Sequence, residues 1–205
     1  MQLADADGIG ALTMRSLATA LGVQPMAIYH HLANKEQILD GIVDLVFAEI
    51  DQSPSDAPWR TGLESRSASI RKVLGRHPWA IGLMESRRSP GPATLGHHDS
   101  VIALLRNAGF TYASIAHAIA VLDAYVYGFV LQEISLPFDG PEDVSELAEQ
   151  ILEQMPADEY PSFVEFARQH VLQPGYDFGD EFEIGLAMVL DGIARLDGAP
   201  NSPIS

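Results

Sequence analysis

The stretch that decides the fold is LTMRSLATALGVQPMAIYHHLANKEQILDGIVD, residues 12–44. Thr13 precedes a short amphipathic helix, MRSLATAL, and threonine is a favourable N-cap. Gly22 then supplies a left-handed position that ends this helix. Gln24 and Pro25 open a second short helix, because proline is suited to a first turn. Two short helices joined by a glycine-containing turn are typical of the helix-turn-helix, whose second helix enters the DNA major groove.

The second helix is predicted to continue through His31, with Ile28 and Leu32 anchoring it. A third helix is predicted to begin at Asn34, since Gln37 follows at the spacing of a capping box. The sequence therefore predicts three successive helices in a small N-terminal domain.

The exposed residues of the second helix suit contact with DNA. Gln24 can pair with adenine, and the small apolar groups of Met26 and Ala27 can touch thymine methyls. Farther along, side chains typically reach phosphates and fix the register of the protein; this group comprises Tyr29, His30, His31 and Lys35. Similar helix pairs also occur in helical proteins that bind no DNA, so the pattern alone leaves that structural interpretation open.

The run from Leu12 to Asp44 resembles the DNA-binding domain of TetR-family transcriptional repressors. It matches the pattern Leu-Thr, Leu-Ala, Leu-Gly-Val, Tyr-x-His and Asn-Lys-x-x-Leu-Leu, with Ile38-Leu39 as the final pair. The resemblance implies a homodimeric, ligand-responsive repressor that binds a palindromic operator. It further implies a role for each group of residues. Thr13 and Arg15 approach the DNA backbone, and residues 24–30, including Pro25, form the helix that reads the bases. Tyr29, His31 and Lys35 contact phosphates.

Charge is the main argument against DNA binding. The chain of 205 residues has a formal net charge of -16, and nonspecific DNA affinity comes from Lys and Arg. Residues 135–205 hold 15 acidic and only 2 basic residues, so most of the negative charge lies in the last third. Arg15 and Lys35 are the only basic residues among the first fifty. Family members usually carry a longer first helix after a basic arm, so we expect either an upstream arm or weak DNA affinity.

The remainder is predicted to be all-helical, because apolar residues recur at three- and four-residue spacing and strand signals are almost missing. We expect an all-α fold, with an N-terminal helix-turn-helix domain and a larger helical ligand-binding and dimerisation domain. We expect domains at 1–51 and 58–197 and a loose tail at 198–205. Helices are expected at about 58–75, 78–87, 93–107, 111–134, 142–154, 159–172 and 180–196.

Three segments of the larger domain, HPWAIGLMESR, AYVYGFVLQE and FEIGLAMVLDGIARL, resemble the branch of the family that contains the tetracycline repressor. The last helix carries apolar residues from Phe182 to Leu196, with glycines and alanines that permit close helix approach. We therefore expect it to join the long helix from Thr111 in a four-helix dimer interface. A monomeric bundle that packs these faces internally is the alternative.

The inducer site is predicted to be mainly apolar with a few polar groups. Seven residues are candidate liners, although each also fits an ordinary core: Trp79, Leu83, Met84, His98, His117, Tyr125 and Phe129. By approximate alignment with the tetracycline repressor, Leu83 and Gln132 stand where a metal-binding His and a partner-chain Glu are expected. We therefore expect neither a tetracycline–magnesium complex nor any other metal or cofactor. His97-His98-Asp99 is unsuitable because consecutive residues spread around a helix.

Other classes of function find little support. The chain has no cysteine and no GxSxG, HExxH or phosphate-loop motif, so no enzyme is predicted. The first ten residues lack the basic segment of a secretory signal, and residues 115–131 are expected to fall short of a membrane span. A cytoplasmic protein without membrane contact is expected. The alternative function is a helical ligand-binding or adaptor protein whose DNA binding is weak or lost.

Overall fold

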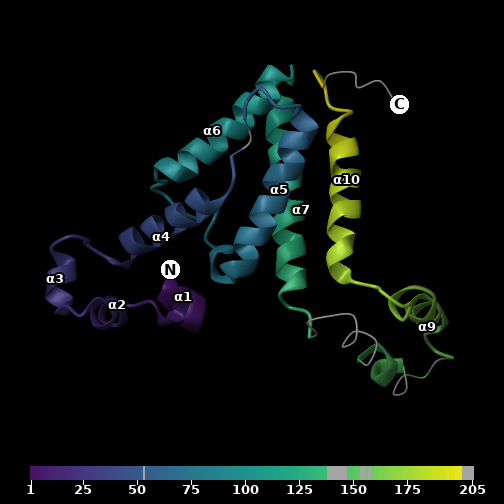
Figure 1. Cartoon of the computed structure of the whole chain (residues 1–205), viewed down its shortest axis with the longest axis horizontal. Helices are drawn as coiled ribbons and strands as arrows, with labels where there is room; N and C mark the ends of the chain where they lie inside the picture. Colours follow the sequence, from purple (N-terminus) through teal and green to yellow (C-terminus); the bar gives the residue numbers. More distant parts are fainter. Residues whose placement is uncertain (53, 138–146, 153–155, 157, 200–205) are drawn as a thin grey trace. The chain divides into compact units, whose positions relative to one another are not determined.

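The computed structural model describes residues 1–52, 54–137, 147–152, 156 and 158–199. Every regular element among these residues is helical, which confirms the predicted all-α class. The α-helices are α1 (Gln2–Asp7), α2 (Met14–Leu21), α3 (Pro25–Tyr29), α4 (Lys35–Glu49), α5 (Trp59–Arg76), α6 (Pro92–Asn107), α7 (Tyr112–Glu133), α9 (Pro161–Phe166) and α10 (Glu181–Ile193) (Figure 1). Residues 147–152 are also helical. Shorter elements are the 3-10 helices η1 (Ile9–Ala11), η2 (Pro78–Ala80) and η4 (Phe178–Asp180) and the π-helix η3 (Ala167–Val171).

The chain forms two compact units. The first comprises Met1–Leu131 with the described residues from Leu186 onward, and the second comprises the described residues of Gln132–Gly185. The unit boundaries fall within α7 and α10. They do not coincide with the predicted domain boundaries near residues 51 and 58, and that division stays a prediction. The predicted tail begins at Gly198, which packs against the turn at Gly109; residues 200–205 lie outside the described residues.

Local signals in the first unit act as predicted. Thr13 accepts a hydrogen bond from the Ser16 amide at 3.0 Å, while the Ser16 hydroxyl accepts one from the Thr13 amide, forming a capping box. Gly22 ends α2 with φ 66°, and Pro25 occupies the first turn of α3. At the start of α4, Asn34 accepts from the Gln37 amide at 3.1 Å. These bonds fix where each short helix begins and ends.

Replacing Thr13 by alanine is expected to lower the free energy of unfolding by about 1 kcal/mol, because the amide of Ser16 loses its acceptor. Urea unfolding at fixed protein concentration measures this. The matched control is Thr19→Ala, because the Thr19 hydroxyl donates only to the Arg15 carbonyl within the helix and its loss should change stability by less than about 0.5 kcal/mol. Equal effects of the two substitutions would contradict the capping role.

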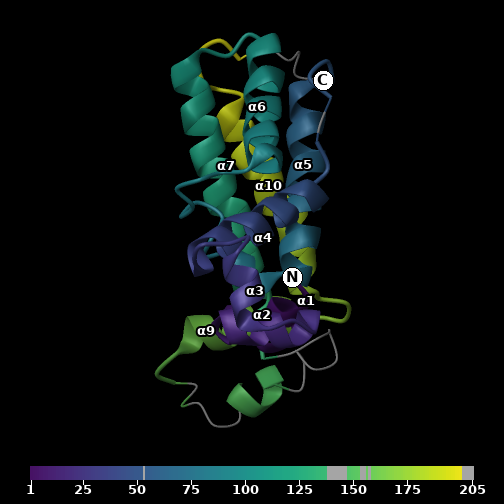
Figure 2. The ribbon, with the colours of Figure 1, turned by 90° about the vertical axis from the view of Figure 1, so that its left-hand side faces the viewer.

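The larger part of the first unit is a bundle. Figure 1 shows α5 and α7 running alongside one another, with α6 meeting their upper end and slanting away from them, and Figure 2 shows the same helices from the side. Arg60 of α5 donates to Asp191 of α10 at 2.8 Å, which ties the last helix to the same bundle. The core is formed by fully buried side chains from all four helices, among them Leu63, Ile70, Leu104, Leu105, Leu122 and Leu190.

Several predicted elements differ from the structure. The expected helix 78–87 is only the 3-10 turn η2 followed by further turns, because successive amides bond three residues back, as Ala80 does to His77. The second helix ends at Tyr29 rather than His31. The expected helix 159–172 is divided into α9 and the π-helix. Of the expected helix 142–154, residues 142–146 and 153–154 lie outside the described residues.

Helix α7 is a core helix with an unusually apolar sequence. Its length and composition would allow it to cross a membrane. The expectation that residues 115–131 fall short of a membrane span was therefore wrong with respect to length and composition. Core helices pass the same test, however, and 44% of the apolar window of α7 is buried inside the structure. Buried residues such as Leu122 and Val126 place it in the bundle.

Candidate functional site

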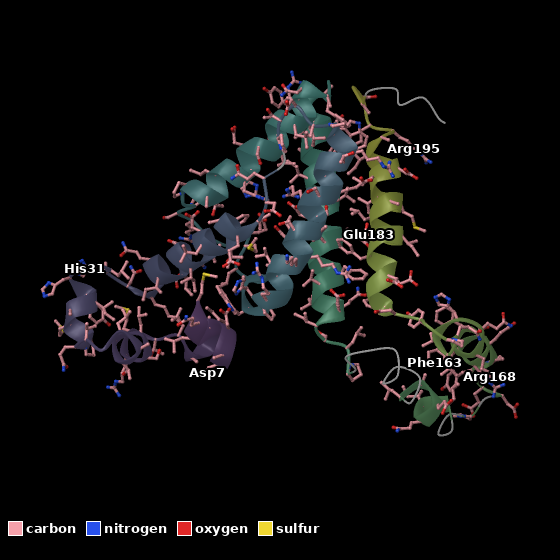
Figure 3. The ribbon with its side chains drawn as sticks, viewed as in Figure 1. Asp7, His31, Phe163, Arg168, Glu183 and Arg195 are labelled. Atoms are coloured by element: carbon pink, nitrogen blue, oxygen red, sulfur yellow. The ribbon has the colours of Figure 1, made fainter. Side chains whose placement is uncertain are left out.

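The predicted DNA-contact residues gather on the small N-terminal helices, and all of them are exposed or half-buried. Met26 of α3 is 68% exposed and Tyr29 is 48% exposed, although both side chains are large and apolar. Ile28, which anchors α3, is buried. Figure 3 shows His31 pointing outward just beyond α3. One face of α3 thus holds the helix in place while the other is free to contact DNA.

The positive charges of this surface are also free. Among the described residues, Arg15 and Lys35 make no ion pair, so both can neutralise phosphates. Leu21 and Val23 flank Gly22 and are 62% and 43% exposed. They add to the exposed apolar area of the N-terminal helices.

An apolar cluster joins the N-terminal helices and α4 to the segment between α5 and α6. It comprises Leu12, Ile38, Leu39 and Ile42, which are buried, and Trp79 and Leu83 pack against it. Trp79 and Leu83 were predicted to line a ligand site, so the structure gives them contacts that join two parts of the first unit. The N-terminal helices and the segment between α5 and α6 therefore share one apolar cluster.

Hydrogen bonds and ion pairs beside this cluster form a network that is called the polar clasp below. Its members are Asp5, Glu49, Arg76, His77 and Trp79. The Asp5 carboxylate of α1 lies 2.6 Å from Nδ1 of His77 and accepts from Nε1 of Trp79 at 2.6 Å. Nε2 of His77 lies 3.3 Å from Glu49, which also pairs with Arg76 at 2.8 Å. Burial acts to raise the pKa of Asp5, but the bonds from Trp79 and His77 outweigh it and the pKa is lowered. The clasp fixes α1 against the ends of α4 and α5.

Carboxylates on one face of α4 make a second connection. Glu36, Asp40 and Asp44 lie four residues apart and so share a face of the helix. Arg87 contacts Glu36 at 2.8 Å and Asp40 at 3.5 Å. Asp44 accepts from the amide and the hydroxyl of Thr94, both at 2.8 Å, in the first turn of α6. Helix α4 is therefore held to the first turn of α6 through Asp44 and to the segment before α6 through Arg87.

A buried polar cluster lies deeper in the bundle. Arg66 of α5 donates from Nη1 to Asp123 of α7 at 3.0 Å, and both residues are buried. His97 of α6 is 1% exposed. Burial lowers the pKa of His97 to about 3, with contributions from the charges of Arg66 and His98. His97 is therefore neutral at physiological pH. Its ring centroid lies 5.1 Å from that of Phe47 of α4.

An apolar cavity of about 630 Å³, open to the surface, has Asp123 of this cluster in its wall. Its wall is one face of α7 together with Ile102 of α6, and the liners with polar groups besides Asp123 are Glu85, Tyr112 and Tyr127. The Tyr127 hydroxyl donates to Glu85 at 3.2 Å, and the pKa of Tyr127 is raised by burial and by the charges of Asp123 and Glu85. The remaining liners are Ile115, Ala116, Ile119, Ala120 and Ala124.

The seven predicted pocket residues are not brought together. Met84 is buried, His98 is half-buried beside Phe47, and His117 is exposed on α7. Tyr125 packs on Phe129, over whose ring the Arg71 guanidinium lies at 5.1 Å. None of the seven lines the 630 Å³ cavity, and their role in ligand binding stays a prediction. In the part of the chain that the structure describes, no group of three or more acidic or histidine side chains could hold a metal ion.

Sequence reasoning missed the residues that form the polar cluster. Arg66 falls at helical spacing with Leu63 and Ile70, so it occupies the apolar face of its helix. Asp123 is the only acidic residue within the apolar run 115–131. A charged residue on the apolar face of each of two helices is therefore a sequence signal for a buried ion pair.

Comparison with known proteins agrees with this arrangement. Residues 1–42 match the family described as bacterial regulatory proteins, tetR family, and residues 53–196 match the tetracyclin repressor-like C-terminal domain. Helices α2 and α3 form the helix-turn-helix and are called the reading head below. The fold and this reading head define a helix-turn-helix transcriptional regulator. The chain belongs to the TetR family, which confirms the predicted resemblance and its tetracycline-repressor-like branch.

Individual relatives carry regulatory names. An HTH-type transcriptional regulator of Saccharopolyspora erythraea is 37% identical over 65% of this chain, which spans only 57% of that relative. The transcriptional repressor DrrR1 of Streptomyces coeruleorubidus is 31% identical over 96% of this chain and 74% of its own length. The structure of ActR from Streptomyces coelicolor in complex with (S)-DNPA has a TM-score of 0.73 at 26% identity, covering 97% of this chain and 94% of ActR.

Proposed function

We propose that the chain is a transcriptional repressor that binds a palindromic DNA operator as a homodimer and is released by a small-molecule inducer. The observation that carries the proposal is the surface of α3. This helix is anchored by buried Ile28 and exposes Gln24, Met26, Ala27 and Tyr29. A regulator of this kind acts in the cytoplasm and catalyses no reaction, and its relatives are named regulators rather than enzymes.

Exposed apolar side chains support the homodimer. The predicted interface included Phe182, Leu186, Leu190 and Ile193, but these are buried within the chain. The other side of the same bundle exposes Met188 of α10 at 69% and Val121 and Leu131 of α7 at about one half. Gly192 has open space around its Cα, which permits close approach of a second helix. A two-fold interface on these helices would present two reading heads to one operator.

The contacts of α4 support a route from inducer to operator. The reading head precedes α4, and α4 is joined to α6 through Asp44 and to the segment before α6 through Arg87. A ligand shifts this equilibrium only if it binds one arrangement of α6 and α4 better than the other. The ActR complex shows that a relative binds a small molecule, and we place the inducer of this chain in its helical domain.

Selection from a random duplex library tests the repressor proposal. The purified full chain, at about 50 mM salt to favour phosphate contacts, is expected to enrich two inverted half-sites whose centres lie about one helical turn or a multiple of it apart. Footprinting of the enriched duplex should protect both half-sites. The failure of the library to enrich any palindrome would favour the alternative ligand-binding or adaptor function.

A further inference from the structure

The cavity along α7 has most of its polar groups at one end. Asp123 and Tyr127 line it four residues apart and so share one face of the helix. The Tyr127 hydroxyl donates to Glu85 at 3.2 Å, which brings a third liner to the same place. Tyr112 precedes Asp123 by about 16 Å along the helix, at 1.5 Å per residue, and the liners between them are apolar. Glu85, Asp123 and Tyr127 are called the acidic end below.

The acidic end has an excess of negative charge. Oδ1 of Asp123 accepts from Arg66, so these two charges offset each other. Nε and Nη2 of Arg66 are buried and unpartnered within the described part of the chain, but Arg66 does not line the cavity, so the carboxylate is the member of the pair that faces a ligand. Glu85 is exposed, and its carboxylate makes no ion pair among the described residues. One negative charge therefore remains without a partner.

The distribution of charge favours a positive ligand in one orientation. No lysine, arginine or histidine is among the described residues that line the cavity, so an anionic group would find no positive partner on its wall. At the opposite end, the guanidinium of Arg106 lies 4.5 Å from the ring centre of Tyr112. A cation is repelled there and attracted by the carboxylates of Glu85 and Asp123. The charged group of a ligand therefore belongs at the acidic end.

Three alanines shape the middle of the wall. Ala116, Ala120 and Ala124 all line the cavity, and their spacing of four residues places them in one row along α7. Their small side chains leave space above the helix, and the larger Ile102 and Ile119 are among the other liners. The volume of about 630 Å³ lies within the range of small-molecule sites. A flat ring system suits a slot of this kind.

We propose that the inducer is an aromatic organic cation, with an ammonium group bound at the acidic end and a flat apolar ring system lying over the alanine row of α7. This inference rests on the proposed function because it names the chemical class of the inducer. Glu85 determines specificity for the positive charge. It stands two residues before Arg87, which pairs with Glu36 and Asp40 of α4, so a ligand that holds Glu85 acts on the segment that contacts α4.

Calorimetric titration of the DNA-free full chain tests the proposal with two probes, 2-naphthylmethylamine and 2-naphthalenemethanol. The probes share their ring system and differ in the polar group, which at neutral pH is an ammonium in the first and a hydroxyl in the second. At low salt the amine is expected to bind at least about fivefold more tightly, since hydrogen bonds between charged groups are the stronger ones. The preference should shrink as salt is raised, because the charge of exposed Glu85 is then screened.

A variant without the free charge should lose this preference. Glu85→Gln keeps an acceptor for the Tyr127 hydroxyl but removes the charge, so the amine is expected to bind no more than about twofold better than the alcohol. An unchanged Kd for the alcohol shows that the variant is folded. The matched control is Glu64→Gln, the same change at a partly exposed residue of α5 that does not line the cavity. This control should keep the full preference for the amine.

A second variant tests the place of the rings. Ala120→Leu fills the slot and should raise the Kd of both probes at least about tenfold, because added methyl groups overpack the space. Ala120 is exposed in the free chain, so the larger side chain finds room without a ligand. Ala113→Leu makes the same change at an exposed position of α7 outside the cavity and should leave both Kd values unchanged.

Three results would overturn the proposal: equal affinity of the original chain for amine and alcohol, a preference for the amine that survives Glu85→Gln, or no binding of either probe because a second copy of the chain covers this face of α7. The titration contains no DNA. Its failure therefore leaves the operator selection untouched, and a failed selection leaves the preference for the amine measurable.

Discussion

Replacing Asp123 by leucine is expected to lower the free energy of unfolding by about 3 to 5 kcal/mol, because the charge of Arg66 is left buried without its partner. The side chain of Arg66 is only 3% exposed, so water cannot replace the lost carboxylate. Urea unfolding followed by circular dichroism measures the change. The protein concentration has to be held fixed, since association with a second copy would contribute to stability.

The double variant Arg66→Met, Asp123→Leu separates the pair from the packing of its side chains. It removes both charges and is expected to restore stability to within about 1 kcal/mol of the original chain, or above it. The matched control is Arg60→Met with Asp191→Leu, an exposed pair between α5 and α10, whose loss should cost less than about 1 kcal/mol. A double variant as unstable as Asp123→Leu would show that lost packing, rather than the unpaired charge, causes the effect.

Replacing Ala27 by glutamate is expected to weaken operator binding by at least about 100-fold while the fold is unchanged. Ala27 is exposed on α3, so the new side chain finds room in the free protein. In the complex, its carboxylate would face the electronegative major groove and the nearby phosphates, and juxtaposed like charges cost several kcal/mol. Fluorescence anisotropy with the selected duplex measures the Kd.

Ala48→Glu is the control for this prediction. Ala48 is exposed near the end of α4, so the same substitution adds the same charge outside the reading head. It should change the Kd by no more than a few-fold through the longer-range field. Equal losses for the two variants would mean that net charge, and not contact by α3, controls DNA binding.

The reading head was predictable because its signals are local. Thr13, Gly22, Pro25 and Asn34 each act on a helix end within four residues of themselves, and the structure shows each in the expected role. The same reasoning failed for residues 78–87, where apolar spacing suggested a helix. Pro78 there begins a 3-10 turn that the chain does not extend into an α-helix.

The polar cluster was not predictable in the same way. Arg66 and Asp123 are 57 positions apart, and His97 lies between them on a third helix. Each residue alone has an ordinary interpretation, either as a solvated charge or as a core histidine. The pairing, and the donors that it leaves unused, depend on how α5, α6 and α7 are packed, which helical periodicity does not determine.

The hydrogen bond from the Thr94 amide to the Asp44 carboxylate makes this amide a probe of the distance between α4 and α6. Helix α6 begins at Pro92, and the Asp44 carboxylate comes so close to Gly91 that a side chain there would collide with it. The Thr94 amide therefore loses its acceptor whenever α4 moves away from α6. Its proton resonance and its rate of exchange with solvent report the separation of the two helices directly, with no label attached to the chain.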